Sequence, residues 1–317
     1  HVVNAIEKVK EIVPIEIALK VFNISRTTFH HYKSTVIHKC EASYFHWCTR
    51  RYSNQLLSKE VLTIKKYVVD VRYTHWSMAS IYLKALRDGN LHCCISTFYK
   101  YCRLLGYNSR RYKRKSDSYN PVKTTSPNEL WCADVTIFKT SDGVKHYIHF
   151  LIDHYSKMIL GYKVEKSSSA SIIKGLLQDA CKRYQHNNVQ LLTDGGSENV
   201  NATVANFLSS LTVPIKHLIA QKDVVFSNSM VEALNNVIKH QFLYHRIIEG
   251  REALEKVLDE VVPIYNTGRP QWSLGGNTPI ETHNGIQINL NNYKSEFKKQ
   301  KVLRIAQNKL SACKVCH

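Results

Sequence analysis

The pattern of apolar and polar positions divides the chain into helical ends and an α/β middle. Up to about residue 107, apolar residues recur at helical spacing between short breaks. From Leu130 the pattern changes to apolar runs of strand length, which alternate with helical stretches as far as Tyr265. This change predicts an all-α region followed by a mixed β-sheet flanked by helices.

The first helical region predicts a helix-turn-helix. Residues 2–33 are helical in pattern with one interruption: a short amphipathic helix over 15–22, a tight turn at 23–24, and Ser25 as the N-cap of a second helix that runs to Lys33. The second helix opens with basic and hydroxyl side chains, which suits entry into a major groove with the N-terminus first. The alternative is an ordinary helical hairpin. The candidate DNA-contacting residues are Arg26, Thr27, Thr28 and His30.

A second helix-turn-helix candidate follows. Helices are predicted over 58–71, 77–86 and 95–105, with a turn at 88–90 and Gly106 as the last C-cap. Its candidate DNA contacts are Ser96, Thr97 and Lys100.

A basic segment separates these helices from the α/β region. Such a basic run is often only a solvated linker. Here it lies between candidate DNA-binding helices and a candidate catalytic region, so contact with DNA phosphates is the better interpretation. Pro121 and Pro127 mark the domain boundary. The basic residues are Arg110, Arg111, Lys113, Arg114 and Lys115.

The α/β region predicts the element order βββαβαβαα. Asp142-Gly143 supplies a hairpin turn between the first two strands. The predicted strands are 130–139, 145–153, 158–164, 189–193 and 215–219, and the predicted helices are 171–186, 202–211, 229–244 and 251–265.

The charge of the chain is concentrated at its two ends. Lys and Arg number 44 against 25 Asp and Glu, a formal net charge of +19. Residues 1–127 carry +14, residues 128–282 carry −1 and residues 283–317 carry +6. A polyanion is therefore the expected partner, with basic arms that neutralise phosphates while the middle keeps its carboxylates free.

Composition excludes several other classes of protein. No apolar run approaches the roughly 18 residues of a membrane span, and no signal peptide is recognised. The nine cysteines have no framework spacing, so we expect reduced thiols in a cytosolic compartment. A membrane protein, a secreted disulfide scaffold and a fibrous protein are not expected.

Three carboxylates stand where chemistry is expected. Asp134 lies inside the first predicted strand among apolar residues, where a charge is costly unless it is paired or bound to metal. Asp194 directly follows the fourth predicted strand, before two glycines, and Glu232 lies early in a helix. Each acid alone could be a capping or ion-paired residue. Together, three oxygen donors suit Mg²⁺ or Mn²⁺, and two such ions about 4 Å apart support in-line displacement at phosphorus.

Residues 130–282 also carry a set of short motifs. They are Trp131-x-x-Asp134-x-Thr136; Ile152-Asp153-His154-Tyr155-Ser156 with Gly161-Tyr162; Thr193-Asp194-x-Gly196-Ser197; Asn228-Ser229-x-x-Glu232 with Lys239; and Tyr265-Asn266-x-x-Arg269-Pro270 with Gly275-Gly276-x-Thr278-Pro279. In combination these motifs resemble the DDE transposase/retroviral-integrase superfamily, and most closely insertion-sequence transposases. Lys157 and Ser229 depart from the usual residues, and a short insertion separates Asp194 from Glu232.

The resemblance implies a ribonuclease-H-like catalytic core preceded by all-α helix-turn-helix modules. It implies Asp134, Asp194 and Glu232 as catalytic metal ligands for two Mg²⁺ or Mn²⁺ ions, and Lys239 as a DNA contact on the same helix face. The expected domains are 1–52 and 53–107 (helical modules), 108–127 (basic linker), 128–282 (catalytic core) and 283–317 (basic C-terminal tail).

The expected function is that of a DNA transposase. It would bind the terminal repeats of a mobile element as double-stranded DNA, cut and join strands into target DNA, and act as a dimer or tetramer in the bacterial cytoplasm at the nucleoid. One alternative is a non-catalytic, sequence-specific DNA-binding protein derived from a transposase, which the three intact acids disfavour. Another is a ribonuclease-H-like nuclease for RNA–DNA hybrids, which the two helix-turn-helix patterns and Lys239 disfavour.

Two clusters that contain cysteine are candidate zinc sites. His38, Cys40, His46 and Cys48 form paired His-x-Cys steps, but zinc modules usually have other spacings. Cys313-x-x-Cys316 in the basic tail is half of a common zinc motif. Burial of the first cluster and an ordinary tail for the second are the simpler interpretations.

Overall fold

The computed structural model of the chain describes residues 1–37, 52–107, 122–184, 188–197, 199–220 and 229–311. The chain forms two compact units, which are considered separately. One contains residues 1–60 and 295–317, and the other contains residues 61–294. None of the helices in the described part of the chain combines the length and apolar character that a membrane span needs.

Three short helices form the N-terminal part of the first unit. They are α1 (Val2–Val9), α2 (Ile15–Val21) and α3 (Arg26–Ile37). Val3, Ile6, Ala18, Leu19 and Phe29 form their buried core. The predicted N-cap is confirmed, because the Ser25 hydroxyl accepts a hydrogen bond of 3.0 Å from the amide of Thr28. The helical pattern predicted over residues 2–33 is interrupted twice rather than once. Residues 10–14 separate α1 from α2, and Pro14 is the N-cap of α2.

The C-terminal segment corrects the predicted tail. Residues Tyr293–Ser311 form the 19-residue helix α12. Within the first unit, Arg304 is buried against Glu60 with donor–acceptor distances of 2.7–2.9 Å. One turn later, Asn308 donates to the carbonyl oxygens of Ser53 and Gln55. The positive charge of this segment suggested a solvated tail, but Arg304 and Asn308 lie four residues apart and share one buried helix face.

The three helices predicted over 58–71, 77–86 and 95–105 are confirmed, with ends that differ by one or two residues. These are α4 (Ser58–Val69), α5 (Met78–Arg87) and α6 (Ile95–Leu104). Ser77 caps α5 by accepting from the amide of Ser80. Tyr82 and Phe98 join α5 to α6, with ring centroids 5.5 Å apart.

A five-stranded mixed sheet forms the centre of the second unit. Its strands lie in the order β3-β2-β1-β4-β5, with β1, β2 and β3 antiparallel and β1, β4 and β5 parallel. Gly143 has φ +85°, as the predicted hairpin turn between the first two strands requires. The strands are β1 (Leu130–Lys139), β2 (Lys145–Asp153), β3 (Ile159–Glu165), β4 (Gln190–Thr193) and β5 (Lys216–Ile219).

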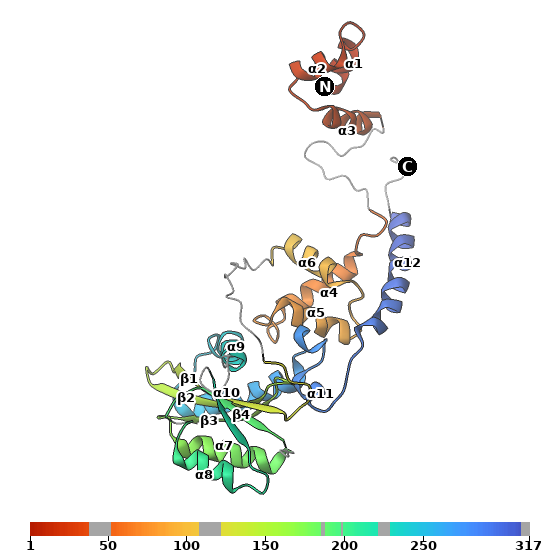
Figure 1. The fold of residues 1–317 in the computed structure, drawn as a ribbon. Coiled ribbons are helices and arrows are strands. Elements are labelled where there is room, and N and C mark those ends of the chain that lie inside the picture. Colours follow the sequence, from red (N-terminus) through yellow and green to blue (C-terminus); the bar gives the residue numbers. More distant parts are fainter. Residues whose placement is uncertain (38–51, 108–121, 185–187, 198, 221–228, 312–317) are drawn as a thin grey trace. The chain divides into compact units, whose positions relative to one another are not determined.

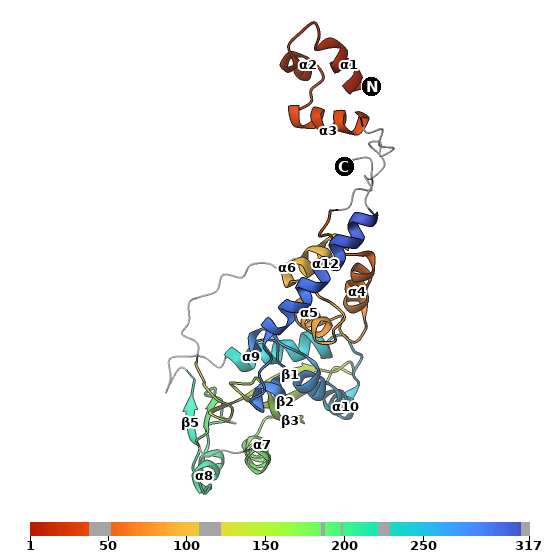
Figure 2. The ribbon, with the colours of Figure 1, turned by 90° about the vertical axis from the view of Figure 1, so that its right-hand side faces the viewer.

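Helices cover both faces of this sheet (Figures 1 and 2). α7 (Ala170–Arg183) and α8 (Ala202–Ser210) pack on the face that carries Trp131, Ala133 and Leu151. α9 (Ser229–Ile238) and α10 (Gly250–Pro263) lie on the other face. The predicted order βββαβαβαα is therefore confirmed.

The last two predicted helices end differently from the prediction. The predicted helix over 229–244 leaves α-helical geometry at residue 239, and the one over 251–265 does so at residue 264. Each ends in a π-helical turn, Lys239–Leu243 and Ile264–Gly268. Short elements then complete the unit: Trp272–Leu274, α11 (Pro279–His283) and Leu290–Asn292.

His149 in β2 makes stability sensitive to acid. Its side chain is 0% exposed, and in the described part of the chain neither ring nitrogen has a hydrogen-bond partner. Burial lowers the pKa of this histidine from 6.5 to about 4. In the unfolded chain His149 is protonated below about pH 6.5, whereas in the folded chain it stays neutral down to about pH 4. The free energy of unfolding therefore decreases as pH falls from 6.5 to 4.

We expect His149→Leu to remove this part of the acid sensitivity. The contribution is on the order of 3 kcal/mol between pH 7 and pH 4. Urea unfolding of both proteins at pH 7, 5.5 and 4.5 measures it, with His30→Leu, an exposed histidine, as the control. An equal loss of stability in wild type and His149→Leu would contradict the prediction.

Candidate active site

Two of the three predicted acids come from neighbouring parallel strands. In the pairing of β1 with β4, Trp131 lies opposite Leu191 and Cys132 opposite Leu192. The same register, extended by two residues, places Asp134 beside Asp194, just past the end of β4. Paired strands are about 4.8 Å apart, so the two carboxylates project from adjacent backbones at the same level of the sheet.

α9 brings the third acid to this position. The Asn235 side-chain amide donates a 2.8 Å hydrogen bond to the Asp134 carboxylate, which joins α9 to β1. Glu232 lies three residues earlier in α9, on the same side of the helix. Burial, together with the negative charges of Asp194 and Glu232, raises the pKa of Asp134 to about 6. The three carboxylates are therefore close enough to act on one another electrostatically.

The three acids are near one another, but their carboxylates do not surround a single metal position. In the part of the chain that the structure describes, no three Asp, Glu, His or Cys side chains converge to metal-binding distance. Asp194 and Glu232 are exposed, whereas Asp134 is half-buried. A divalent ion bound there would ligate carboxylate oxygens and relieve their mutual repulsion.

Two asparagines that sequence reasoning missed hold the aspartates. The buried Asn199 donates a 2.7 Å hydrogen bond to the Asp194 carboxylate, as Asn235 does to Asp134. The Oδ1 atoms of both asparagines are buried and lack hydrogen-bond partners. The position of Asn235, one turn after Glu232 and between apolar Leu234 and Ile238, is a signal that could have identified it.

We expect Asn235→Leu to reduce strand transfer about a hundredfold. The substitution keeps the volume approximately but removes the donor that orients the Asp134 carboxylate, and supporting residues of metal ligands typically contribute 10- to 100-fold. When strand transfer is measured against Mn²⁺ concentration, the variant should need more Mn²⁺ than wild type to reach half of its maximal rate. High Mn²⁺ should partly restore the rate. Asn236→Leu, an exposed neighbour, is the matched control. A wild-type metal profile for Asn235→Leu would exclude the role.

Lys239 lies at the junction of α9 and its π-helical turn. Seven residues, or about two turns, separate it from Glu232, so the two share a helix face. Burial lowers the pKa of Lys239, and the negative charge of Asp134 opposes this shift. The ammonium group is therefore near enough to the Asp134 carboxylate to feel its charge. Its predicted contact with DNA stays a prediction.

The DNA-contact candidates on the helical modules lie near the starts of α3 and α6. Arg26, Thr27 and His30 are exposed on α3, and Thr28 bonds to the Ser25 hydroxyl. Ser96 and Thr97 each lie 3.1 Å from the Cys94 sulfur, and Lys100 is exposed. Their role stays a prediction. Arg110, Arg111, Lys113, Arg114 and Lys115 lie outside the described residues, as do the zinc candidates His38, Cys40, His46, Cys48, Cys313 and Cys316.

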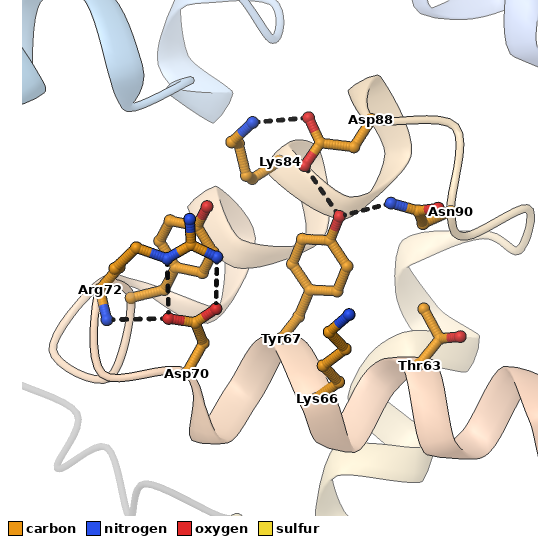
Figure 3. Close-up of a pocket in the computed structure, with 9 residues that line it drawn as sticks. Thr63, Lys66, Tyr67, Asp70, Arg72, Lys84, Asp88 and Asn90 are labelled. Carbon is orange, nitrogen blue, oxygen red and sulfur yellow. Dashed lines mark hydrogen bonds and ion pairs between the residues drawn. The ribbon is translucent and has the colours of Figure 1, made fainter.

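A separate pocket of about 290 Å³ lies between α4 and α5 (Figure 3). Its charges are largely paired: Arg72 binds Asp70, and Lys84 binds Asp88. The Tyr67 hydroxyl donates to Asp88 and accepts from Asn90, both at 2.8 Å. This network joins the ends of two helices, so we interpret the pocket as structural.

Comparison with known proteins agrees with this geometry. Residues 124–222 match the model of the integrase core domain family. The transposase for insertion sequence element IS904 from Lactococcus lactis is 24% identical over 73% of this chain and 96% of its own length. The InsK protein of insertion sequence element IS150 from Escherichia coli is 28% identical over 51% of this chain, and the match spans 56% of that protein.

A solved structure is also similar. The catalytic core domain of HTLV-2 integrase in complex with magnesium has a TM-score of 0.40 and 20% identity, over 51% of this chain and 99% of that one. The family match covers β1 to β5, the strands that carry Asp134 and Asp194. Residues 124–222 therefore match an integrase core domain, and the chain is similar to transposases of insertion sequences.

Proposed function

We propose that this protein is a transposase that cuts and joins DNA strands at the ends of a mobile element. The observation that carries the proposal is the approach of Asp134, Asp194 and Glu232 from β1, β4 and α9, with both aspartates inside the region that matches an integrase core domain. The insertion-sequence proteins it is similar to support the same class of reaction. The chemistry is transfer of a phosphoryl group between oxygen atoms of DNA strands.

Asp134, Asp194 and Glu232 would hold two Mg²⁺ or Mn²⁺ ions. When bound, these ions supply activation of the attacking oxygen and charge stabilisation at the leaving oxygen. The three acids suit such ions because they are hard oxygen donors, and a cation would offset both the burial of the Asp134 charge and its repulsion by Asp194 and Glu232, which together raise its pKa. Asn235 and Asn199 orient the two aspartates, and Lys239 would contact a phosphate beside the scissile bond.

The helical modules would recognise DNA sequence. α3 and α6 each begin with exposed polar or hydroxyl side chains suited to a major groove. A +14 charge over residues 1–127 would supply phosphate neutralisation. The full assembly would be a homodimer or homotetramer on double-stranded terminal-repeat and target DNA, working at the nucleoid in the bacterial cytoplasm.

The test is to incubate the full chain and Mn²⁺ with the DNA that flanks its own gene and to map new 3′-OH ends. New ends at one position in each flanking repeat, followed by their joining to a target plasmid, support the proposal. DNA that is bound but never cut, across a range of Mn²⁺ and Mg²⁺ concentrations, contradicts it and favours the non-catalytic alternative.

A further inference from the structure

Two cations beside the β2–β3 turn have no acidic partner. Arg269 is only 5% exposed, yet its Nε atom has no hydrogen-bond partner among the residues that the structure describes. Lys157 is half-buried, and its ammonium group donates a 2.6 Å hydrogen bond to the Ser273 hydroxyl. Among the described residues, neither cation forms an ion pair.

The fold holds these two residues together by specific contacts. Asn266 donates to the Ile159 carbonyl at 2.9 Å and accepts from the Ile159 amide at 3.0 Å, so the segment after α10 is fixed to the edge strand β3. Arg269 lies three residues after Asn266, and Lys157 lies two residues before Ile159. Lys157 also has φ +60°, a left-handed conformation that glycine adopts more easily than lysine.

The charges of these residues oppose one another. Burial lowers the pKa of both groups, and the charge of Arg269 lowers the pKa of Lys157 further. The neighbouring Asp153 carboxylate does not compensate them, because it is fully buried and accepts from the amides of Asn128 and Ser156 and from the Ser156 hydroxyl. A buried and a half-buried positive charge, with no counter-charge among the described residues, destabilise the free protein.

A third donor lies on the same loop. The Gln271 side-chain amide nitrogen is buried beside the Tyr265 hydroxyl, and within the described residues it makes no hydrogen bond of 3.5 Å or shorter. A guanidinium, an ammonium and an amide together offer several N–H donors and no negative charge. An anion with several acceptor oxygens fits this set, and phosphate is the form in which DNA presents one.

We propose that Lys157 and Arg269, assisted by Gln271, bind a backbone phosphate of the DNA on which the carboxylates act. This inference rests on the proposed function. The Lys157 turn follows Asp153, which pairs with Trp131, three residues before Asp134 in β1. That separation is about 10 Å along the strand, or about three base-pair steps of DNA. α10 contacts the edge strand β3 and lies on the sheet face that carries α9 (Figures 1 and 2).

The first arm of the test measures DNA affinity against salt concentration for the full chain. Lys157→Gln and Arg269→Met should each weaken binding of terminal-repeat DNA about tenfold at moderate salt. Each should reduce the log–log salt slope by about one, because one phosphate contact is lost. The double variant should lose little more than either single variant, since both residues serve the same phosphate. Lys157→Arg should bind as wild type does.

The second arm uses inorganic phosphate alone. Phosphate should raise the thermal midpoint of wild type above that in chloride at equal ionic strength, and it should not do so for Lys157→Gln. In the absence of any anion, Arg269→Met should melt at or above the wild-type midpoint, because an uncompensated charge has been removed. Lys163→Gln is the matched control: this lysine is exposed on β3, in register with His149 and therefore on the face opposite Asp134.

The outcomes separate this site from the proposed function. A reduced salt slope together with loss of phosphate stabilisation supports the DNA site. Phosphate stabilisation with an unchanged DNA slope overturns it in favour of a site for free anions only. Unchanged slopes and no phosphate effect overturn it entirely. A chain that binds no DNA but is stabilised by phosphate through Lys157 refutes the proposed function and leaves only the anion site.

Discussion

We expect Asp134→Asn to lower the rate of strand transfer by about a thousandfold or more, while affinity for terminal-repeat DNA stays within about twofold. The carboxylate would lose its charge but keep its shape, so the hydrogen bond from Asn235 can be replaced by a similar contact. Removal of one member of a catalytic set that acts as a unit eliminates most of the rate. No phosphate contact is lost, so binding is preserved.

The same substitution should stabilise the metal-free protein. Asp134 is half-buried, and its pKa is raised to about 6 by burial and by the charges of Asp194 and Glu232. At neutral pH the folded chain therefore holds an unfavourable negative charge, which asparagine removes. We expect a higher thermal midpoint without metal, and a smaller increase on addition of Mn²⁺ than in wild type. Strand transfer at the wild-type rate in Asp134→Asn would disprove the assignment.

The strands of the catalytic core could be predicted because their signals are local. Apolar runs bounded by turn residues predicted β1, β2 and β3 to within a residue or two, and Asp142-Gly143 specified the turn between the first two. The motifs that contain Asp134 and Asp194 then identified the family. The pairing of β1 with β4, which places these acids side by side, is a long-range contact that only the topology of the known family implied.

The contacts that support the site could not be predicted in this way. Asn235 and Asn199 act through tertiary hydrogen bonds to acids that are remote from Asn235 and five residues from Asn199. The π-helical turn at Lys239 leaves the apolar spacing of a short helix almost unchanged, so an α-helix over the whole of 229–244 was the natural expectation. The contact of Lys157 with the Ser273 loop likewise has no local signal.

The C-terminal helix α12 shows most clearly that long-range polar contacts cannot be predicted from local sequence. Residues 293–311 are rich in lysine and poor in apolar residues, which favours a solvated segment. Their order instead depends on buried polar contacts: Arg304 to Glu60, and Asn308 to two backbone carbonyls. Arg304 pairs with an acid 244 residues away in the sequence. From sequence alone, such a buried arginine cannot be distinguished from one that is exposed to solvent.

We therefore expect Arg304→Ala to release α12 from its contacts within the first unit. Glu60 and Arg304 are 8% and 5% exposed, and truncation of one partner leaves the other charge buried without compensation, at a cost of about 3–5 kcal/mol. Amide hydrogen exchange over residues 293–311 should accelerate by about two to three orders of magnitude, since each 1.4 kcal/mol corresponds to a factor of ten.

Two further variants separate the ion pair from a general effect on the helix. Lys299→Ala removes an exposed partner from the same helix, 72% exposed and paired with Glu296, and should change exchange less than about threefold. Glu60→Leu combined with Arg304→Met replaces both buried charges with apolar groups and should recover much of the lost protection. If Arg304→Ala exchanges no faster than Lys299→Ala, the buried pair does not hold the helix, and the contacts of Asn308 must suffice.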